Sequence, residues 1–90
     1  MSAKKMTVVD VRSREEYASG HVVDSLNIPL NELPANVDKL KAIDGDIVLC
    51  CASGMRSSMA RQILMQQGIS NVSDGGPWTS VQYQIVNNLM

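Results

Sequence analysis

Phenylalanine is absent from this 90-residue chain, which also has only one tryptophan and two tyrosines. An aromatic core is therefore excluded, and the interior has to be built from valine, isoleucine, leucine, methionine and alanine. Ninety residues are near the small end of what folds unaided, so the chain is expected to form one domain. We expect a single domain over residues 1–90, with residues 1–5 disordered.

An excess of charge of either sign is also lacking, since the formal net charge is −1 and the signs are interspersed. This balance favours neither nucleic acid nor an anionic membrane as a partner. No apolar run approaches the roughly 20 residues of a membrane span. Residues 1–5 are basic but lack the apolar stretch of a signal peptide, which predicts a cytoplasmic location. The periplasm is the alternative if a leader has been removed.

Cysteine is scarce, and its two copies, Cys50 and Cys51, are adjacent. Two adjacent cysteines do not form an ordinary disulfide framework, and a disulfide between them would be strained. A reducing compartment is the simpler interpretation.

The most informative stretch is Ile47–Ser57. It begins with a short apolar run of β character that ends at the two thiols. A compact loop of small residues follows, containing an arginine and a serine pair. The next segment, Ser58–Gln67, has the spacing of an amphipathic helix. Its expected apolar side is formed by Met59, Ala60, Ile63 and Leu64.

This order of strand, loop and helix has chemical consequences. The first turn of a helix leaves backbone N–H groups unpaired and carries partial positive charge. A loop of small residues can turn its own N–H groups inward to bind an anion, and Gly54 permits the positive φ that such a turn requires. Arg56 adds a planar cation suited to oxyanions. A cysteine in this field should be a reactive thiolate with a lowered pKa.

Spacing alone leaves open which cysteine is reactive. Cys51 precedes Arg56 by four intervening residues, whereas Cys50 precedes it by five, which is the spacing of phosphatases with a cysteine nucleophile. Side chains alternate along a strand, so the two thiols should point to opposite sides. One should face a helix-covered core and the other the loop.

The remaining segments alternate between strand and helix patterns. We expect strands at Met6–Val11, Ser25–Ile28 and Ile69–Val72, and a tight loop at Asp74–Trp78. We expect a short helix that opens with Ser13–Tyr17 and stops at Gly20, and further helices at Leu30–Ile43 (with Asn31 as a candidate cap) and Thr79–Leu89. Trp78 is expected to fill core. Alternation of this kind predicts an α/β fold with a mostly parallel sheet of four to five strands and helices on both faces. Ligands of such folds bind beyond the carboxyl ends of the strands, where the cysteine loop lies.

Four polar residues outside the loop are given structural roles. Asp10 and Arg12 lie at the end of a buried strand and are expected to pair, because an unpaired buried charge is costly. Glu16 lies three residues after Ser13, the spacing of a capping box. His21, the only histidine, follows Gly20 with no partner nucleophile nearby, so a local hydrogen bond is expected rather than general-base catalysis.

Several blocks together resemble a single-domain rhodanese of the compact phage-shock-protein-E type. The resemblance runs from about Val8 to Trp78. The blocks are Asp10-Val11-Arg12, Glu15-Glu16-Tyr17, Gly20-His21-Val22, Asn27-Ile28-Pro29-Leu30, Cys51-Ala52-Ser53-Gly54-Met55-Arg56-Ser57 and Gly75-Gly76 with Trp78. Departures are Asp24-Ser25, where relatives commonly have Gly-Ala, Pro77 in place of an aliphatic residue, and the neighbouring Cys50.

The resemblance implies that Cys51 is the catalytic residue. It places the backbone N–H groups of residues 52–57 around the sulfur, and it implies that Arg56 binds the donor anion. The substrate-binding residues are thus expected to be Ala52, Ser53, Gly54, Met55, Arg56 and Ser57. The six-residue loop from Cys51 to Arg56 is one residue shorter than that of related cell-cycle phosphatases and suits a sulfur atom better than a phosphate.

The implied reaction moves sulfane sulfur from thiosulfate or a similar anion to cyanide or a thiol through a Cys51 persulfide. It requires no metal and no organic cofactor. A protein acceptor fits the same chemistry, and we expect a monomer. Two alternatives stay open: a module that carries persulfide to a protein partner without turnover, and a phosphatase or arsenate reductase that uses Cys50 or Cys51.

Overall fold

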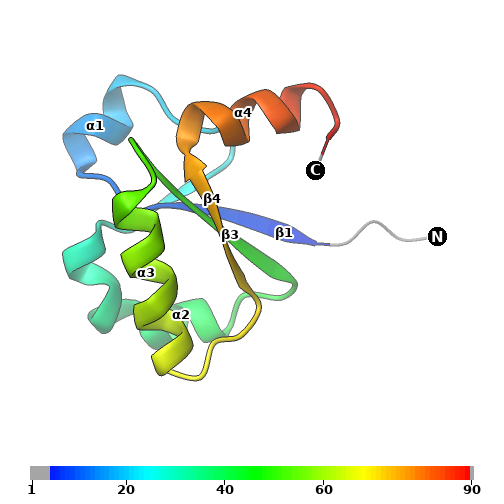
Figure 1. Cartoon of the computed structure of the whole chain (residues 1–90). Helices are drawn as coiled ribbons and strands as arrows, with labels where there is room; N and C mark the ends of the chain where they lie inside the picture. The colour runs from blue at the N-terminus through cyan, green and yellow to red at the C-terminus, as the bar shows by residue number, and fades with distance from the viewer. Residues whose placement is uncertain (1–4, 90) are drawn as a thin grey trace.

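The computed structural model describes residues 5–89, so the expected disorder of residues 1–5 lies almost wholly outside the described residues. Its centre is a parallel sheet of four strands in the order β2-β1-β3-β4 (Figure 1). The strands are β1 (Met6–Asp10), β2 (Leu26–Asn27), β3 (Asp46–Cys51) and β4 (Val72–Pro77). The expected α/β fold with a parallel sheet is confirmed.

Helices cover both faces of the sheet, as expected (Figure 1). They are α1 (Arg14–Ser19), the 3₁₀ helix η1 (Leu30–Asn36), α2 (Val37–Lys41), α3 (Met55–Gln66) and α4 (Trp78–Val86). η1, α2 and α3 pack on one face through Leu33, Leu40 and Leu64. α4 packs on the other through Val81. Parallel strands buried on both faces explain why β1 and β3 are almost continuously apolar.

The two cores follow from the alternation of side chains along β3. Leu49 and Cys51 point toward the α3 side, whereas Val48 and Cys50 point toward α4. Both cores are aliphatic, as the shortage of aromatic residues required. The prediction that the two thiols face opposite sides of the sheet is therefore confirmed.

The segment expected to be one helix from Leu30 to Ile43 is two shorter ones. A 3₁₀ helix runs to Asn36, and the α-helix begins only at Val37. Pro34 lies inside the first of these, where it removes a backbone donor and disfavours the α conformation at the residue before it. The residue before the segment is Pro29, so Asn31 is not its cap.

The last strand begins later than the sequence predicts. The segment Ile69–Val72 was expected to be a strand and Asp74–Trp78 a loop, but β4 starts at Val72 and includes the double glycine. Gly75 is required there because a Cβ would lie 2.8 Å from Val48 Cγ1 and 2.7 Å from Val81 Cγ2. Glycine thus marks close packing against the sheet and α4, not a turn.

Two further boundaries differ. α3 starts at Met55 rather than Ser58, so Arg56 and Ser57 belong to its first turn. Met59, expected on the apolar side of this helix, is 53% exposed, while Ala60 and Leu64 are buried. Within residues 5–89, no helix has the length and apolar character to cross a membrane.

Candidate active site

Cys51 is the last residue of β3 and lies at the carboxyl edge of the sheet. Residues 52–54 form a short bend, and Gly54 has a φ of 102° directly before the first turn of α3. A left-handed conformation at this point costs a glycine little, and it lets the chain turn back over the strand end. The thiol, the loop and the start of the helix therefore follow one another in the order predicted from the sequence.

The Cys51 sulfur is enclosed by polar groups of this loop. The backbone N–H of Gly54 donates to Cys51 Sγ at 2.9 Å, and Ser57 Oγ lies 3.4 Å from the same sulfur. Burial acts to raise the pKa of Cys51, but the hydrogen bonds that the Ser57 side chain and the backbone of Ser57, Gly54 and Ser53 offer to the ionised sulfur outweigh it, so the pKa is lowered. The thiol is fully buried, yet the Gly54 amide of the expected cradle is directed at it.

Cys50 has the opposite environment. Its side chain is buried against α4 beside Asp10, and burial together with this carboxylate raises its pKa to about 12. Both cysteines are free thiols. Cys50 therefore stays protonated at neutral pH, where Cys51 is the thiol disposed to ionise.

The guanidinium of Arg56 is paired with the carboxylate of Glu16. Its Nη1 and Nη2 donate to Glu16 Oε1 and Oε2 at 2.7 and 2.9 Å. Glu16 also accepts from the backbone N–H and hydroxyl of Ser13, which completes the capping box predicted at the start of α1. The pair ties α1 to the first turn of α3 at the rim of the cysteine loop.

The same pair makes the protein sensitive to acid. The Arg56 guanidinium and the Ser13 backbone N–H lower the pKa of Glu16 from 4.5 to about 2. The folded state therefore binds this proton less well than the unfolded chain does. The stability that the pair contributes is present above pH 4.5 and is lost as the pH falls toward 2.

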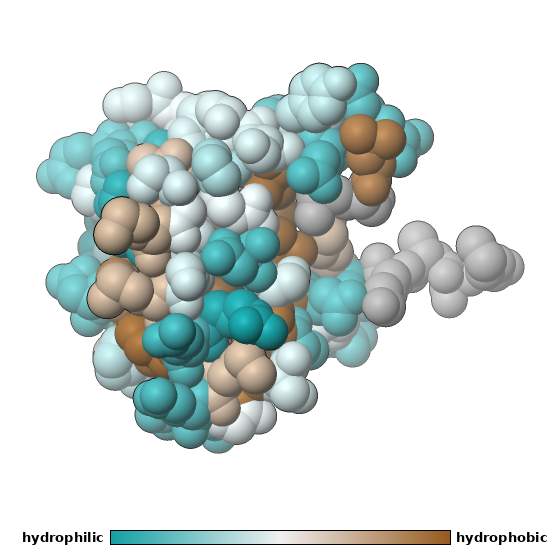
Figure 2. All heavy atoms as spheres, in the orientation of Figure 1, coloured by the Kyte–Doolittle hydropathy of each residue, from teal (hydrophilic) through white to brown (hydrophobic). Residues whose placement is uncertain are grey.

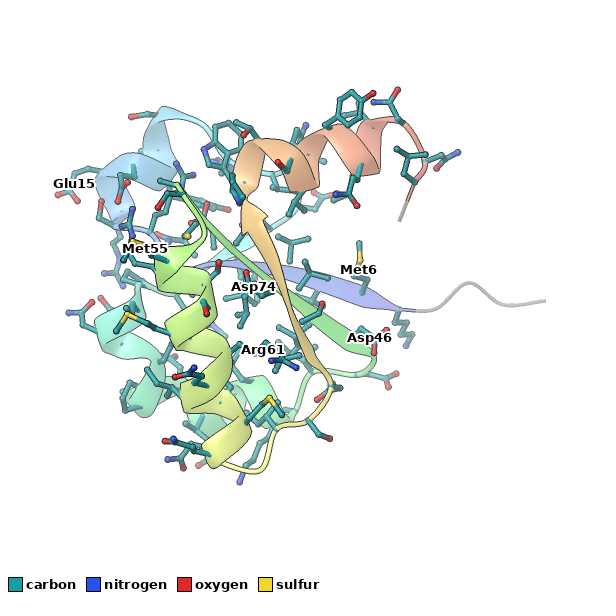
Figure 3. The ribbon with its side chains drawn as sticks, in the orientation of Figure 1. Met6, Glu15, Asp46, Met55, Arg61 and Asp74 are labelled. Atoms are coloured by element: carbon teal, nitrogen blue, oxygen red, sulfur yellow. The ribbon has the colours of Figure 1, made fainter. Side chains whose placement is uncertain are left out.

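We expect Glu16→Gln to lower the free energy of unfolding at neutral pH and to flatten its decrease in acid. The effect should be modest because both side chains are 37% exposed. Urea unfolding at a series of acidic pH values measures it. Glu15→Gln is the matched control, since Glu15 points away from the molecule (Figure 3). Equal pH profiles for the wild type and Glu16→Gln would contradict the expectation.

Asp10 and Arg12 form the buried pair that the sequence suggested. Arg12 Nε and Nη2 donate to the Asp10 carboxylate at 3.0 and 2.7 Å, and Nη2 also donates to Gly20 O at 2.6 Å. The guanidinium carbon lies 5.0 Å from the centre of the Trp78 ring, which is half-buried against the α4 core. The pair fastens the end of β1 to the loop after α1.

His21 contacts Tyr17 rather than the cysteine loop. Its Nδ1 lies 2.7 Å from Tyr17 O, and its ring stacks on the Tyr17 ring with centroids 3.7 Å apart. The local hydrogen bond expected for this histidine is present. Its structural role, like those of Asp10, Arg12 and Glu16, stays a prediction.

The sequence analysis missed Asp74, which β4 places opposite the first turn of α3 (Figure 3). Its Oδ1 accepts from Ser57 Oγ at 2.6 Å and from Gly76 N at 2.9 Å. The available signal was its place before Gly75-Gly76 near the carboxyl end of a parallel strand. That signal was lost because the double glycine suggested a loop.

The surface beside the loop is an open groove of about 690 Å³ between α1, η1 and α3. Arg56, Met59 and Leu30 are among its lining residues. Met55 and Met59 are 74% and 53% exposed at the start of α3, on a face that Figure 2 shows as a mixture of hydrophilic and hydrophobic residues. Among residues 5–89, no histidine, cysteine, aspartate and glutamate cluster is arranged to hold a metal ion.

Comparison with known proteins identifies a family, several relatives and solved structures that are similar to this chain. The family model of the rhodanese-like domain matches residues 1–76. Thiosulfate sulfurtransferase PspE of Escherichia coli (strain K12) is 33% identical over 69 residues, covering 76% of this chain and 66% of PspE. YrkF of Bacillus subtilis (strain 168), to which a sulfur-carrier role is ascribed, is 34% identical over 82 residues, covering 87% of this chain and 44% of YrkF. A solved structure, "rhodanese with anions from E. coli", superimposes with a TM-score of 0.77 at 27% identity, covering 84% of this chain and 91% of that one.

The chain belongs to the rhodanese-like domain family, and its relatives include sulfurtransferases. The resemblance inferred from the sequence blocks is thereby confirmed. The aligned parts span about two thirds of PspE and under half of YrkF.

Proposed function

We propose that this protein is a thiosulfate sulfurtransferase in which Cys51 carries the transferred sulfur. The observation that carries the proposal is the Gly54 N–H aimed at Cys51 Sγ at 2.9 Å, at the carboxyl end of a parallel strand. A sulfur that accepts backbone donors is stabilised as an anion, and the anion is the nucleophile. Membership of the rhodanese-like family supports sulfur as the group transferred.

The reaction is a double displacement. The Cys51 thiolate attacks the outer sulfur of thiosulfate, a new S–S bond forms, and sulfite leaves with the electron pair of the old one. Cyanide or a thiolate then attacks the outer sulfur of the persulfide. The S–S bond breaks, the acceptor departs with the sulfur, and the Cys51 thiolate is restored. No external oxidant or reductant is required.

The residues around the sulfur have separate tasks in this proposal. The amides of Ser53, Gly54 and Ser57 stabilise the anionic sulfur, Ala52 belongs to the bend after the strand, and Met55 begins the helix. Arg56 spends two of its five N–H donors on Glu16. Its remaining donors bind the donor anion, and the carboxylate holds the guanidinium at the rim of the loop.

The test is thiocyanate formation from thiosulfate and cyanide, together with intact-mass measurement after thiosulfate alone. The proposal expects turnover and a mass increase of one sulfur atom. A phosphatase would instead hydrolyse a phosphate ester and gain no sulfur. The absence of both turnover and sulfur uptake would overturn the proposal.

A sulfur carrier is the second candidate, supported by the similarity to YrkF. The exposed Met55 and Met59 beside the groove suit contact with a protein acceptor. Sulfur uptake without cyanide turnover distinguishes the carrier from the enzyme. In both versions of the proposal the protein is a cytoplasmic monomer that acts on a small anionic donor without a metal or cofactor.

A further inference from the structure

The hydroxyl of Ser57 has more partners than hydrogens. Its Oγ lies 2.6 Å from Asp74 Oδ1, 3.1 Å from Gly54 O and 3.4 Å from Cys51 Sγ. A serine hydroxyl has one hydrogen to donate and two lone pairs with which to accept. The carboxylate and the carbonyl can only accept, so these two compete for the one hydrogen, and the sulfur joins the competition only when it is ionised.

The shortest contact identifies the partner that receives this hydrogen. A distance of 2.6 Å is typical of a hydroxyl that donates to an ionised carboxylate, which is among the stronger hydrogen bonds in proteins. Gly54 O does not depend on Ser57, because it already accepts from Ser58 N at 3.2 Å. Ser57 therefore donates to Asp74 and presents a lone pair to the sulfur.

This arrangement suits a thiol but not a thiolate. A Cys51 S–H donates to the Ser57 lone pair, whereas an ionised sulfur needs a hydrogen in that place. Ser57 Oγ is buried and fixed, so the change is made by rotating its O–H bond away from Asp74. The Cys51 proton passes to the solvent.

We propose that Asp74 is a positioning residue that holds the Ser57 hydrogen away from Cys51 and thereby sets how readily Cys51 ionises. The hydrogen turns to the sulfur when Cys51 becomes a thiolate or an anionic persulfide. Asp74 thus favours the resting thiol, and Ser57 favours the reactive anion. The catalytic relevance of this role rests on the proposed function, but the acidity of Cys51 can be measured without any sulfur donor.

The proposal predicts opposite effects from two neighbouring residues. Asp74→Asn replaces a charged acceptor with a neutral one, so the hydrogen becomes easier to turn and the pKa of Cys51 should fall by about one unit. Ser57→Ala removes the donor to the thiolate, so the pKa should rise. If Asp74 acts through the hydroxyl, Asp74→Asn should have almost no effect in the Ser57→Ala protein.

The experiment is a titration of the thiolate by its ultraviolet absorbance. It is done in a Cys50→Ala background so that one thiol titrates, and the profile of the Cys51→Ser protein is subtracted to remove tyrosine. The other charged groups near the sulfur, Arg56 on α3 and its partner Glu16 on α1, are unchanged throughout. Asp38→Asn on α2, which removes the same charge elsewhere, is the matched control and should leave the pKa unchanged.

Asp74→Ser is a second neutral variant in case Asp74→Asn does not fold, since its hydroxyl can still accept from Gly76 N. It should also lower the pKa of Cys51. An unchanged or raised pKa in both variants would overturn the proposal. A fall of equal size with and without Ser57 would also overturn it, because Asp74 would then act through its field alone. Neither result depends on whether the protein transfers sulfur.

Discussion

Cys51→Ser is expected to reduce thiocyanate formation by at least about a thousandfold, because a serine hydroxyl does not ionise near neutral pH and cannot form a persulfide. Intact-mass measurement after thiosulfate should show no added sulfur. The fold should persist, since oxygen and sulfur differ little in size and Gly54 N can donate to either.

Cys50→Ser is the matched control, because it changes the same atom one residue earlier on the opposite face of the sheet. We expect it to take up one sulfur atom as the wild type does. Its stability should fall somewhat, because a hydroxyl replaces a fully buried thiol. Sulfur uptake by Cys51→Ser but not by Cys50→Ser would show that the reactive thiol has been assigned to the wrong residue.

Arg12→Met is expected to have the largest effect on stability. It leaves the Asp10 carboxylate fully buried without its cation, and breaking a buried pair in this way costs about 3–5 kcal/mol. Small domains have only about 5–15 kcal/mol in total, so the variant should be close to unfolding. Urea unfolding monitored by circular dichroism measures the loss.

The double variant Asp10→Asn/Arg12→Met tests the reason for that loss. Because it removes the uncompensated charge, it should be more stable than Arg12→Met alone. A double variant that is less stable than the single one would contradict the account. A cost below about 0.5 kcal/mol for Arg12→Met, the range of ordinary surface substitutions, would contradict it as well.

The features that could be predicted from the sequence depend on residues that lie close together in the chain. The capping box of Ser13 and Glu16 depends on two residues three positions apart, and the structure has both of its hydrogen bonds. The opposite directions of Cys50 and Cys51 follow from the geometry of one strand. Spacing alone did not choose between these cysteines, because each had an arginine at a plausible distance.

Contacts between distant segments were not predictable. Arg56 and Glu16 are 40 residues apart, and nothing local indicates that the capping residue of α1 also holds the arginine of the cysteine loop. Asp74 was missed because glycine is typical of turns, whereas Gly75 is needed here for close packing of β4 against Val48 and Val81. Tertiary packing overrode the local preference in this case.

The acidity of Cys51 tests the central claim most directly. Titration of the thiolate in the Cys50→Ala protein, with Cys50→Ala/Cys51→Ser as the blank, should give a pKa below that of an ordinary cysteine, because the Ser57 hydroxyl and the amides of Ser57, Gly54 and Ser53 outweigh the effect of burial. A pKa at or above the ordinary cysteine value would show that the loop does not hold an anionic sulfur, and it would contradict the account.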